Sequence, residues 1–185
     1  MSSQDSDRLK QDHAELDGLL RQLNAALESN DVTRIYATLD LFWARLAMHI
    51  RAEHLHLFET ILQAVNRKRG ALGDDTPPIE EAEKTIEQLR EDHNFFMLEL
   101  SRAVAVVRGL LANPEADVTE PLQNVRKGVH AVQQRLIKHN EIEENGVYLW
   151  TRTLLSEEEQ SELAALVQKE LENTPPRFSA TTNEP

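Results

Sequence analysis

The chain has 185 residues, a formal net charge of −12 at pH 7 and no cysteine. This length suits one domain with a substantial hydrophobic core, and the acidic charge argues against nucleic acid or an anionic membrane as a partner. The missing thiols exclude disulfides and thiolate metal ligands, and the polar N-terminus, with no long apolar run behind it, predicts a cytoplasmic protein without a membrane span.

Four long segments carry apolar residues at helical spacing and are predicted to be helices. They cover approximately residues 5–29, 32–69, 79–113 and 118–150. Asn30-Asp31 supplies turn and N-cap chemistry between the first two, and residues 70–78 form a loop rich in Gly, Asp and Pro. Asn145-Gly146 weakens the fourth helical pattern, and we expect a bend there. Ser156 and the three glutamates after it predict a shorter fifth helix that reaches about Asn173.

These elements predict an all-α fold, because no strand pattern occurs in the sequence. Four long amphipathic helices joined by short loops favour an up-down-up-down antiparallel four-helix bundle, here with a short C-terminal fifth helix. The expected domain covers residues 1–173. The remaining segment, 174–185, has adjacent prolines and little apolar content, and we expect it to be a disordered tail.

Two of the helices place a histidine four residues before a glutamate on their apolar stripe. These pairs are His49 with Glu53 and His139 with Glu143. Both side chains of such a pair emerge from one helical face about one turn apart. The motif alone is weak, because histidine and glutamate are frequent enough here for chance matches. Its weight depends on where the other histidines lie.

Two further histidines, His13 and His93, lie on the apolar stripes of the first and third helices. In an antiparallel hairpin, residues at equal height are equidistant from the turn. His13 and His49 are equidistant from the first turn, and His93 and His139 are equidistant from the third. We therefore expect all four histidines at one level of the bundle, facing its interior.

An internal repeat supports this arrangement and indicates two related helical hairpins. Asp12-His13 recurs as Asp92-His93, and the Leu-x-x-His-x-x-x-Glu pattern of residues 46–53 recurs at 136–143. Four imidazoles and two carboxylates in a bundle interior are costly unless a metal compensates for their desolvation. Six ligands exceed one closed tetrahedral zinc site and suit two ions bridged by the glutamates. The expected metal ligands are His13, His49, Glu53, His93, His139 and Glu143.

The order His13, His49-x-x-x-Glu53, His93, His139-x-x-x-Glu143 resembles the hemerythrin-like, HHE cation-binding proteins over roughly residues 5–172. It is more similar to the bacterial type with four histidines and two glutamates than to the oxygen-carrying hemerythrins. The resemblance implies two iron ions in an Fe–O–Fe type non-haem centre, with manganese or mixed metals as alternatives. It also implies a small ligand such as O2, NO or peroxide, and a role in oxygen binding, sensing or stress responses. Met97 replaces a further histidine of the oxygen carriers, which argues against reversible oxygen carriage.

A second set of residues is expected near the ligands, as orienting groups or as pocket lining: Asp17, His56, Glu144, Met97 and Tyr148. His54 and His130 fall off the stripe and are expected in solvent. No separate acid, base or nucleophile stands out, so no catalytic residue is assigned and enzymatic activity is left open. The alternative function is an iron or oxygen sensor, or a metal-dependent regulatory protein without catalysis. A protein partner and the oligomeric state are left open.

Overall fold

The computed structural model describes residues 4–68 and 77–181 of the chain. Its elements in chain order are α1 (Gln4–Ser29), α2 (Val32–Ala52), η1 (Glu53–Leu57), α3 (Phe58–Lys68), α4 (Ile79–Ala112), α5 (Thr119–Ile142), η2 (Glu143–Val147), α6 (Tyr148–Leu154), α7 (Glu157–Glu172) and η3 (Pro176–Thr181). The elements η1 and η2 are π-helical turns, and η3 is a 3-10 helix. Across the described ranges there is no strand.

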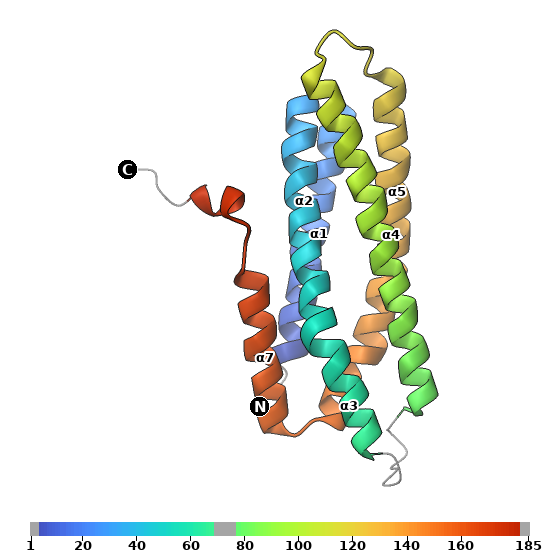
Figure 1. The fold of residues 1–185 in the computed structure, drawn as a ribbon, viewed down its shortest axis with the longest axis vertical. Helices are drawn as coiled ribbons and strands as arrows, with labels where there is room; N and C mark the ends of the chain where they lie inside the picture. Colours follow the sequence, from blue (N-terminus) through green and yellow to red (C-terminus); the bar gives the residue numbers. More distant parts are fainter. Residues whose placement is uncertain (1–3, 69–76, 182–185) are drawn as a thin grey trace.

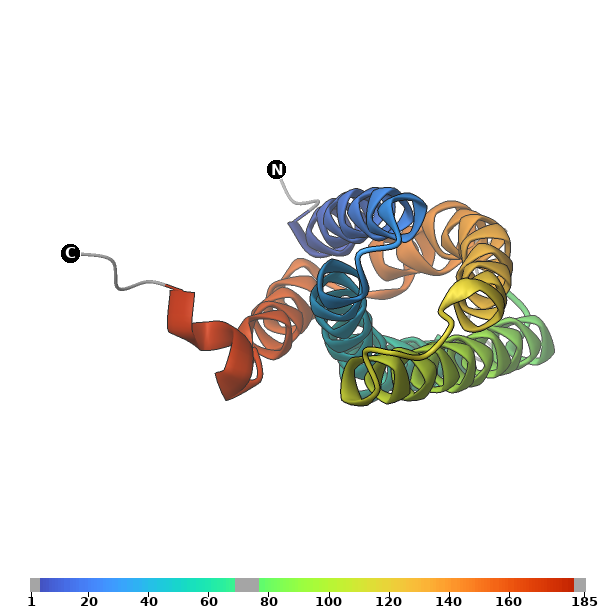
Figure 2. The same ribbon diagram turned by 90° about the horizontal axis from the view of Figure 1, so that it is seen from above.

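Four helical columns run along the long axis of the molecule (Figure 1). They are α1, α2 continued through η1 into α3, α4, and α5 continued through η2 into α6. Seen from above, the four columns surround a common axis, and α7 lies outside them against α1 and α2 (Figure 2). The predicted all-α bundle with a short C-terminal helix is confirmed.

Local sequence explains where several helices begin. Asp31 caps α2 by accepting a hydrogen bond from the backbone N–H of Arg34 at 3.0 Å. Asn30 before it has φ of 56°, a left-handed conformation that Asn tolerates better than most residues. Ser156 and Glu159 form a capping box at the start of α7, as the sequence predicts. Each cap pairs backbone N–H groups that would otherwise lack a partner.

The apolar stripes of the columns meet in two hydrophobic clusters. The upper cluster joins α1, α2, α4 and α5 and contains Phe42 and Phe96, both fully buried. The lower cluster joins the ends of the columns to α7 and contains Phe58 and Ile61. Along α1, Leu9 belongs to the lower cluster and Leu16 to the upper one. A polar layer lies between them, at the level of the expected histidines.

Two predicted irregular segments lie partly outside the described residues. Of the expected loop at 70–78, residues 70–76 are outside them. Of the segment expected to be a disordered tail, residues 182–185 are outside them, whereas Pro176–Thr181 forms the 3-10 helix η3. The guanidinium of Arg177 donates two hydrogen bonds to Asp40 of α2, each of 3.0 Å. This ion pair attaches the segment after α7 to the bundle.

Candidate metal centre

The two glutamates of the His-x-x-x-Glu motifs each begin a π-helical turn. Glu53 starts η1 and Glu143 starts η2, and in each case the carbonyl of the glutamate accepts a hydrogen bond from the N–H five residues later. Such π turns are rare and occur frequently at functional sites. The turn η2 lies where the sequence predicts a bend at Asn145-Gly146, whereas η1 has no such signal. Both turns flank the polar layer.

One cluster of donor atoms is formed by His13, His49 and the two glutamates, all buried. The Nε2 atoms of His13 and His49 are 3.1 Å apart. His13 Nε2 lies 3.3 Å from Glu143 Oε2, and His49 Nε2 lies 3.3 Å from Glu53 Oε1. Four side chains from three helical columns thus converge on one point.

A second cluster repeats this arrangement with His93 and His139. Their Nε2 atoms are 2.9 Å apart. His93 Nε2 lies 3.3 Å from Glu53 Oε2, and His139 Nε2 lies 3.1 Å from Glu143 Oε1. Each glutamate therefore offers one oxygen to each cluster. All six residues expected as metal ligands are brought together, and their coordination of a metal stays a prediction.

The outward ring nitrogen of every one of these imidazoles has its own partner. His49 Nδ1 lies 2.9 Å from Asp12, and His139 Nδ1 lies 3.2 Å from Asp92. His13 Nδ1 lies 3.0 Å from Glu144, and His93 Nδ1 lies 2.8 Å from His54 Nε2. With Nδ1–H donating outward, the lone pair of each Nε2 faces the glutamates. Partners of this kind fix the tautomer and orientation of metal-binding histidines.

Three of these partners were not predicted from the sequence. Asp12 and Asp92 are buried and are held by Arg45 and Arg135, with N–O distances of 2.5 and 2.6 Å. The repeated Asp-His dipeptide was the available signal for them. His54 was expected in solvent, and this was wrong: it is only partly exposed and its ring contacts that of His93.

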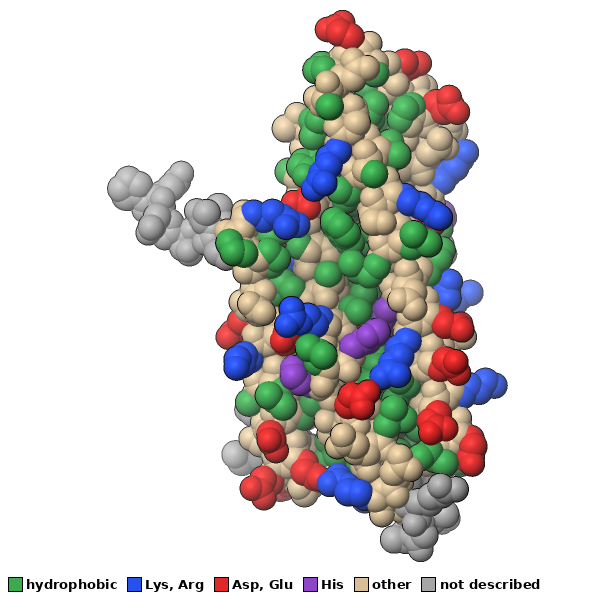
Figure 3. Space-filling view, in the orientation of Figure 1, with side chains coloured by type: hydrophobic (Ala, Val, Ile, Leu, Met, Phe, Trp, Pro, Cys, Tyr) green, Lys and Arg blue, Asp and Glu red, His purple; other side chains and the backbone are tan. Residues whose placement is uncertain are grey.

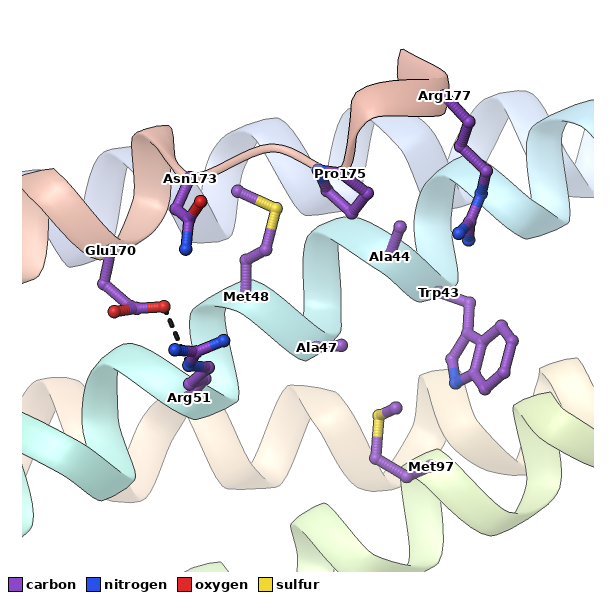
Figure 4. Close-up of a pocket in the computed structure, with 10 residues that line it drawn as sticks. All are labelled: Trp43, Ala44, Ala47, Met48, Arg51, Met97, Glu170, Asn173, Pro175 and Arg177. Carbon is purple, nitrogen blue, oxygen red and sulfur yellow. Dashed lines mark ion pairs between the residues drawn. The ribbon is translucent and has the colours of Figure 1, made fainter. Parts of the chain in front are cut away.

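The residues expected near the ligands divide into two groups. Glu144 and Tyr148 contact His13. Asp17 is exposed on α1, and His56 points to Glu170 of α7 at 4.0 Å. Met97 lies opposite Trp43 in a surface hollow of about 260 Å³ between α2, α4 and the segment after α7 (Figure 4). Only Glu144 and Tyr148 of this set therefore lie at the histidine layer.

The donor clusters are sealed from solvent. The six candidate ligands are at most 4% exposed, and histidine atoms appear only as small patches on the face shown in Figure 3. Aromatic side chains close the layer: the ring of Phe58 stacks on His93 at 6.0 Å, and Phe96 meets His139 edge-on at 5.3 Å. Electrostatic interactions in this layer are consequently screened little by water.

Proximity of opposite charges shifts the pKa values of these groups in the metal-free protein. Burial alone would lower the pKa of His139, but the charge of Glu143 and the hydrogen bond to Asp92 raise it to about 9. Burial would also lower the pKa of His49, but Glu53 and Asp12 raise it well above its ordinary value. Burial would raise the pKa of Glu53, but His49 and His93 hold it well below its ordinary value. Without metal, protons on His49 and His139 offset part of the charge of the carboxylates.

We expect the metal-free protein to be most stable near pH 6.5. His49 and His139 have raised pKa values, so their stabilisation is complete below their ordinary value of 6.5 and is lost as pH rises toward about 9. Burial and the charge of His93 lower the pKa of His54 to about 4, so stability also falls as pH decreases from 6.5 to 4. Glu53 adds a further loss at lower pH, as acid reaches its depressed pKa.

Urea unfolding at a series of pH values, with chelator present, would measure this profile. In His139→Gln the decline of the unfolding free energy between pH 6.5 and 9 should become shallower, because one titrating imidazole is gone. An unfolding free energy that is flat or rising over that interval in the unsubstituted protein would contradict the charge pairing described here.

The chemistry of the donor set fits a metal better than it fits a hydrogen-bonded network. Glu53 Oε2 and Glu143 Oε1 are buried and have no hydrogen-bond partner among the described residues, although imidazole nitrogens approach to 3.3 and 3.1 Å. Each of these oxygens faces an imidazole nitrogen of its own cluster, as groups do when both face a shared point. Buried polar atoms are normally paired, so such orphans need an explanation. Imidazole with carboxylate is a usual ligand set for iron, manganese or zinc.

Comparisons with known proteins add one positive finding. The family model of the hemerythrin HHE cation binding domain matches residues 4–150, a range that includes all six candidate ligands. No match was found among curated proteins, and none among solved structures. In the part of the chain that the structure describes, no helix has the length and apolar character to cross a membrane.

Proposed function

Since this chain belongs to the hemerythrin HHE cation-binding family, we propose that it holds two iron ions, one in each donor cluster, and binds O2, NO or peroxide there. The observation that supports this most is the orientation of the imidazoles. Four Nε2 atoms face two shared glutamates, and the four Nδ1 atoms are held by outer partners. Iron with this ligand set would supply redox chemistry and open positions for a small ligand.

The chain's own residues would have three roles in this function. The six candidate ligands bind, and the outer partners Asp12 and Asp92 keep two of the imidazoles in the tautomer whose Nε2 is free. Phe58 and Phe96 exclude water from the layer. Metal binding would displace the protons that His49 and His139 hold in the metal-free protein, so we expect affinity to increase with pH.

Anaerobic titration of metal-free protein with iron(II), followed by elemental analysis and Mössbauer spectroscopy, tests the proposal. The expected result is two iron ions per chain. Exposure to O2 or NO should then change the visible spectrum of the loaded protein. Binding of one ion or none, or a spectrum that neither gas alters, would contradict the proposal.

We expect Asp12→Asn to weaken metal binding about 10- to 100-fold, the usual cost of losing an outer-shell partner. The neutral amide no longer supports an N–H donor at His49 Nδ1 as strongly, and it can favour the wrong tautomer. The measurement is a competition titration against a coloured chelator.

Asp17→Asn is the matched control for this variant. The substitution makes the same chemical change on the same helix, but Asp17 is exposed and lies away from the histidine layer. Equal affinities of the two variants would mean that Asp12 serves only the fold.

A further inference from the structure

Tyr148 brings a phenol oxygen into the histidine layer. It is the first residue of α6, five residues after Glu143 and directly after the π turn η2. That turn directs its side chain inward, where it is 1% exposed. It is one of only two tyrosines in the sequence, and the other, Tyr36, lies near the start of α2 and receives a hydrogen bond from Arg108.

The phenol oxygen contacts three atoms of the cluster that contains His13. It lies 3.0 Å from Glu53 Oε1, 3.2 Å from His13 Nε2 and 3.4 Å from Glu143 Oε2. Neighbouring donors around an octahedral ion, each about 2.1 Å from it, are roughly 3 Å apart. The other contacts in this cluster measure 3.1 to 3.3 Å. The oxygen therefore has the spacing of an additional donor atom.

The other half of the repeat has no such oxygen at the equivalent place. Five residues after Glu53 and directly after η1 stands Phe58. Its ring stacks on His93, with centroids 6.0 Å apart, much as the ring of Tyr148 stacks on His13 at 5.7 Å. The two rings occupy corresponding places, and only Tyr148 carries a hydroxyl group. The cluster with His93 thus keeps four side-chain donors.

The residue that contacts the outer nitrogen of the α1 or α4 histidine also differs between the two halves. Glu144 beside His13 carries a carboxyl group, whereas the corresponding residue beside His93 is His54, with an imidazole. The two clusters therefore differ in an outer partner as well as in the hydroxyl of Tyr148.

We infer that Tyr148 is a fifth protein ligand of the ion held by His13 and His49, so that the two ion positions are chemically unlike. The inference rests on the proposed function, since it needs a metal in the clusters. On binding, the phenol O–H bond breaks, the proton leaves to bulk water and the oxygen coordinates as tyrosinate, a known ligand of iron. A five-donor position with a phenolate favours a more highly charged ion than its four-donor neighbour does.

The test is the visible absorption and resonance Raman spectrum of iron-loaded, air-oxidised protein. We expect a phenolate-to-iron(III) charge-transfer band with tyrosinate ring modes. Tyr148→Phe should lose the band yet fold with unchanged helical circular dichroism and still take up two iron ions. One of its two binding steps should weaken, by at least the roughly 10- to 100-fold that an outer-shell partner costs.

Tyr36→Phe is the matched control and should retain the full band, because it removes the only other phenol. A complementary variant, Phe58→Tyr, should strengthen the band by giving the second cluster its own phenol. If the unsubstituted protein binds two iron ions without tyrosinate modes, the inference is overturned while the proposed function stands. If it binds none, the proposed function itself fails. A band that survives in Tyr148→Phe also overturns the inference.

Discussion

In the Glu53→Gln variant we expect the affinity for both metal ions to fall by more than about 100-fold, beyond the cost of losing an outer-shell partner. Glu53 places one oxygen in each donor cluster, 3.3 Å from His49 Nε2 and 3.3 Å from His93 Nε2. The amide has nearly the same shape but lacks the negative charge, and its NH2 group cannot donate an electron pair. One substitution therefore damages two binding positions. Elemental analysis after iron loading and gel filtration measures the loss.

Glu59→Gln provides the control for this experiment. Glu59 lies six residues further along the same column, is exposed and pairs with Arg90. This variant should bind two ions with unchanged affinity. If Glu53→Gln lost only one ion, the sharing of this carboxylate between the clusters would be disproved, although metal binding itself would not.

Metal loading should raise the free energy of unfolding by about 4 kcal/mol for each bound ion when the free ion is a thousandfold above its dissociation constant. The unfolded chain has no preformed cluster, so the free energy of binding adds to that of folding. The clusters are also buried, with Glu53 and Glu143 fully so, so a metal that fills them leaves no uncompensated carboxylate in the core. Thermal or urea unfolding with and without iron(II) under anaerobic conditions gives the difference.

Two controls separate this effect from general screening of the net charge of −12. Magnesium at the same concentration should have a small effect, because it prefers oxygen ligands and retains its waters. Glu53→Gln should show little stabilisation by iron. Equal stabilisation by magnesium, or in this variant, would mean that the ions act on the acidic surface.

The sequence predicted the bundle and the convergence of the six candidate ligands because both depend on regular geometry. Apolar spacing gave the helices, and the equal distances of His13 and His49 from one turn gave their common height. Burial of all six residues at one level agrees with that reasoning. Family membership, shown by the matched family model, was inferred from the same six positions.

The residues of the site that the sequence did not predict depend on departures from regular helix geometry or on contacts between columns. A projection at 100° per residue assumes an unbroken α-helix, but η1 and η2 each shift the phase of the residues that follow. His54 therefore reaches His93 instead of solvent. Asp12 lies one position beside the stripe and is buried only because α2 supplies His49 and Arg45 as partners. Such contacts between helices have no periodic signal within one helix.

Glu53 and Glu143 each belong to both donor clusters, and this sharing has a consequence for biosynthesis. The N-terminal hairpin, which leaves the ribosome first, carries His13, His49 and Glu53 but not Glu143, the fourth member of its cluster. A nascent half-chain therefore contains only three of the four groups of that cluster. If the clusters hold ions as proposed, full coordination would wait until translation has delivered the last column and the hairpins have docked. The choice of cation would thereby be made by the finished chain.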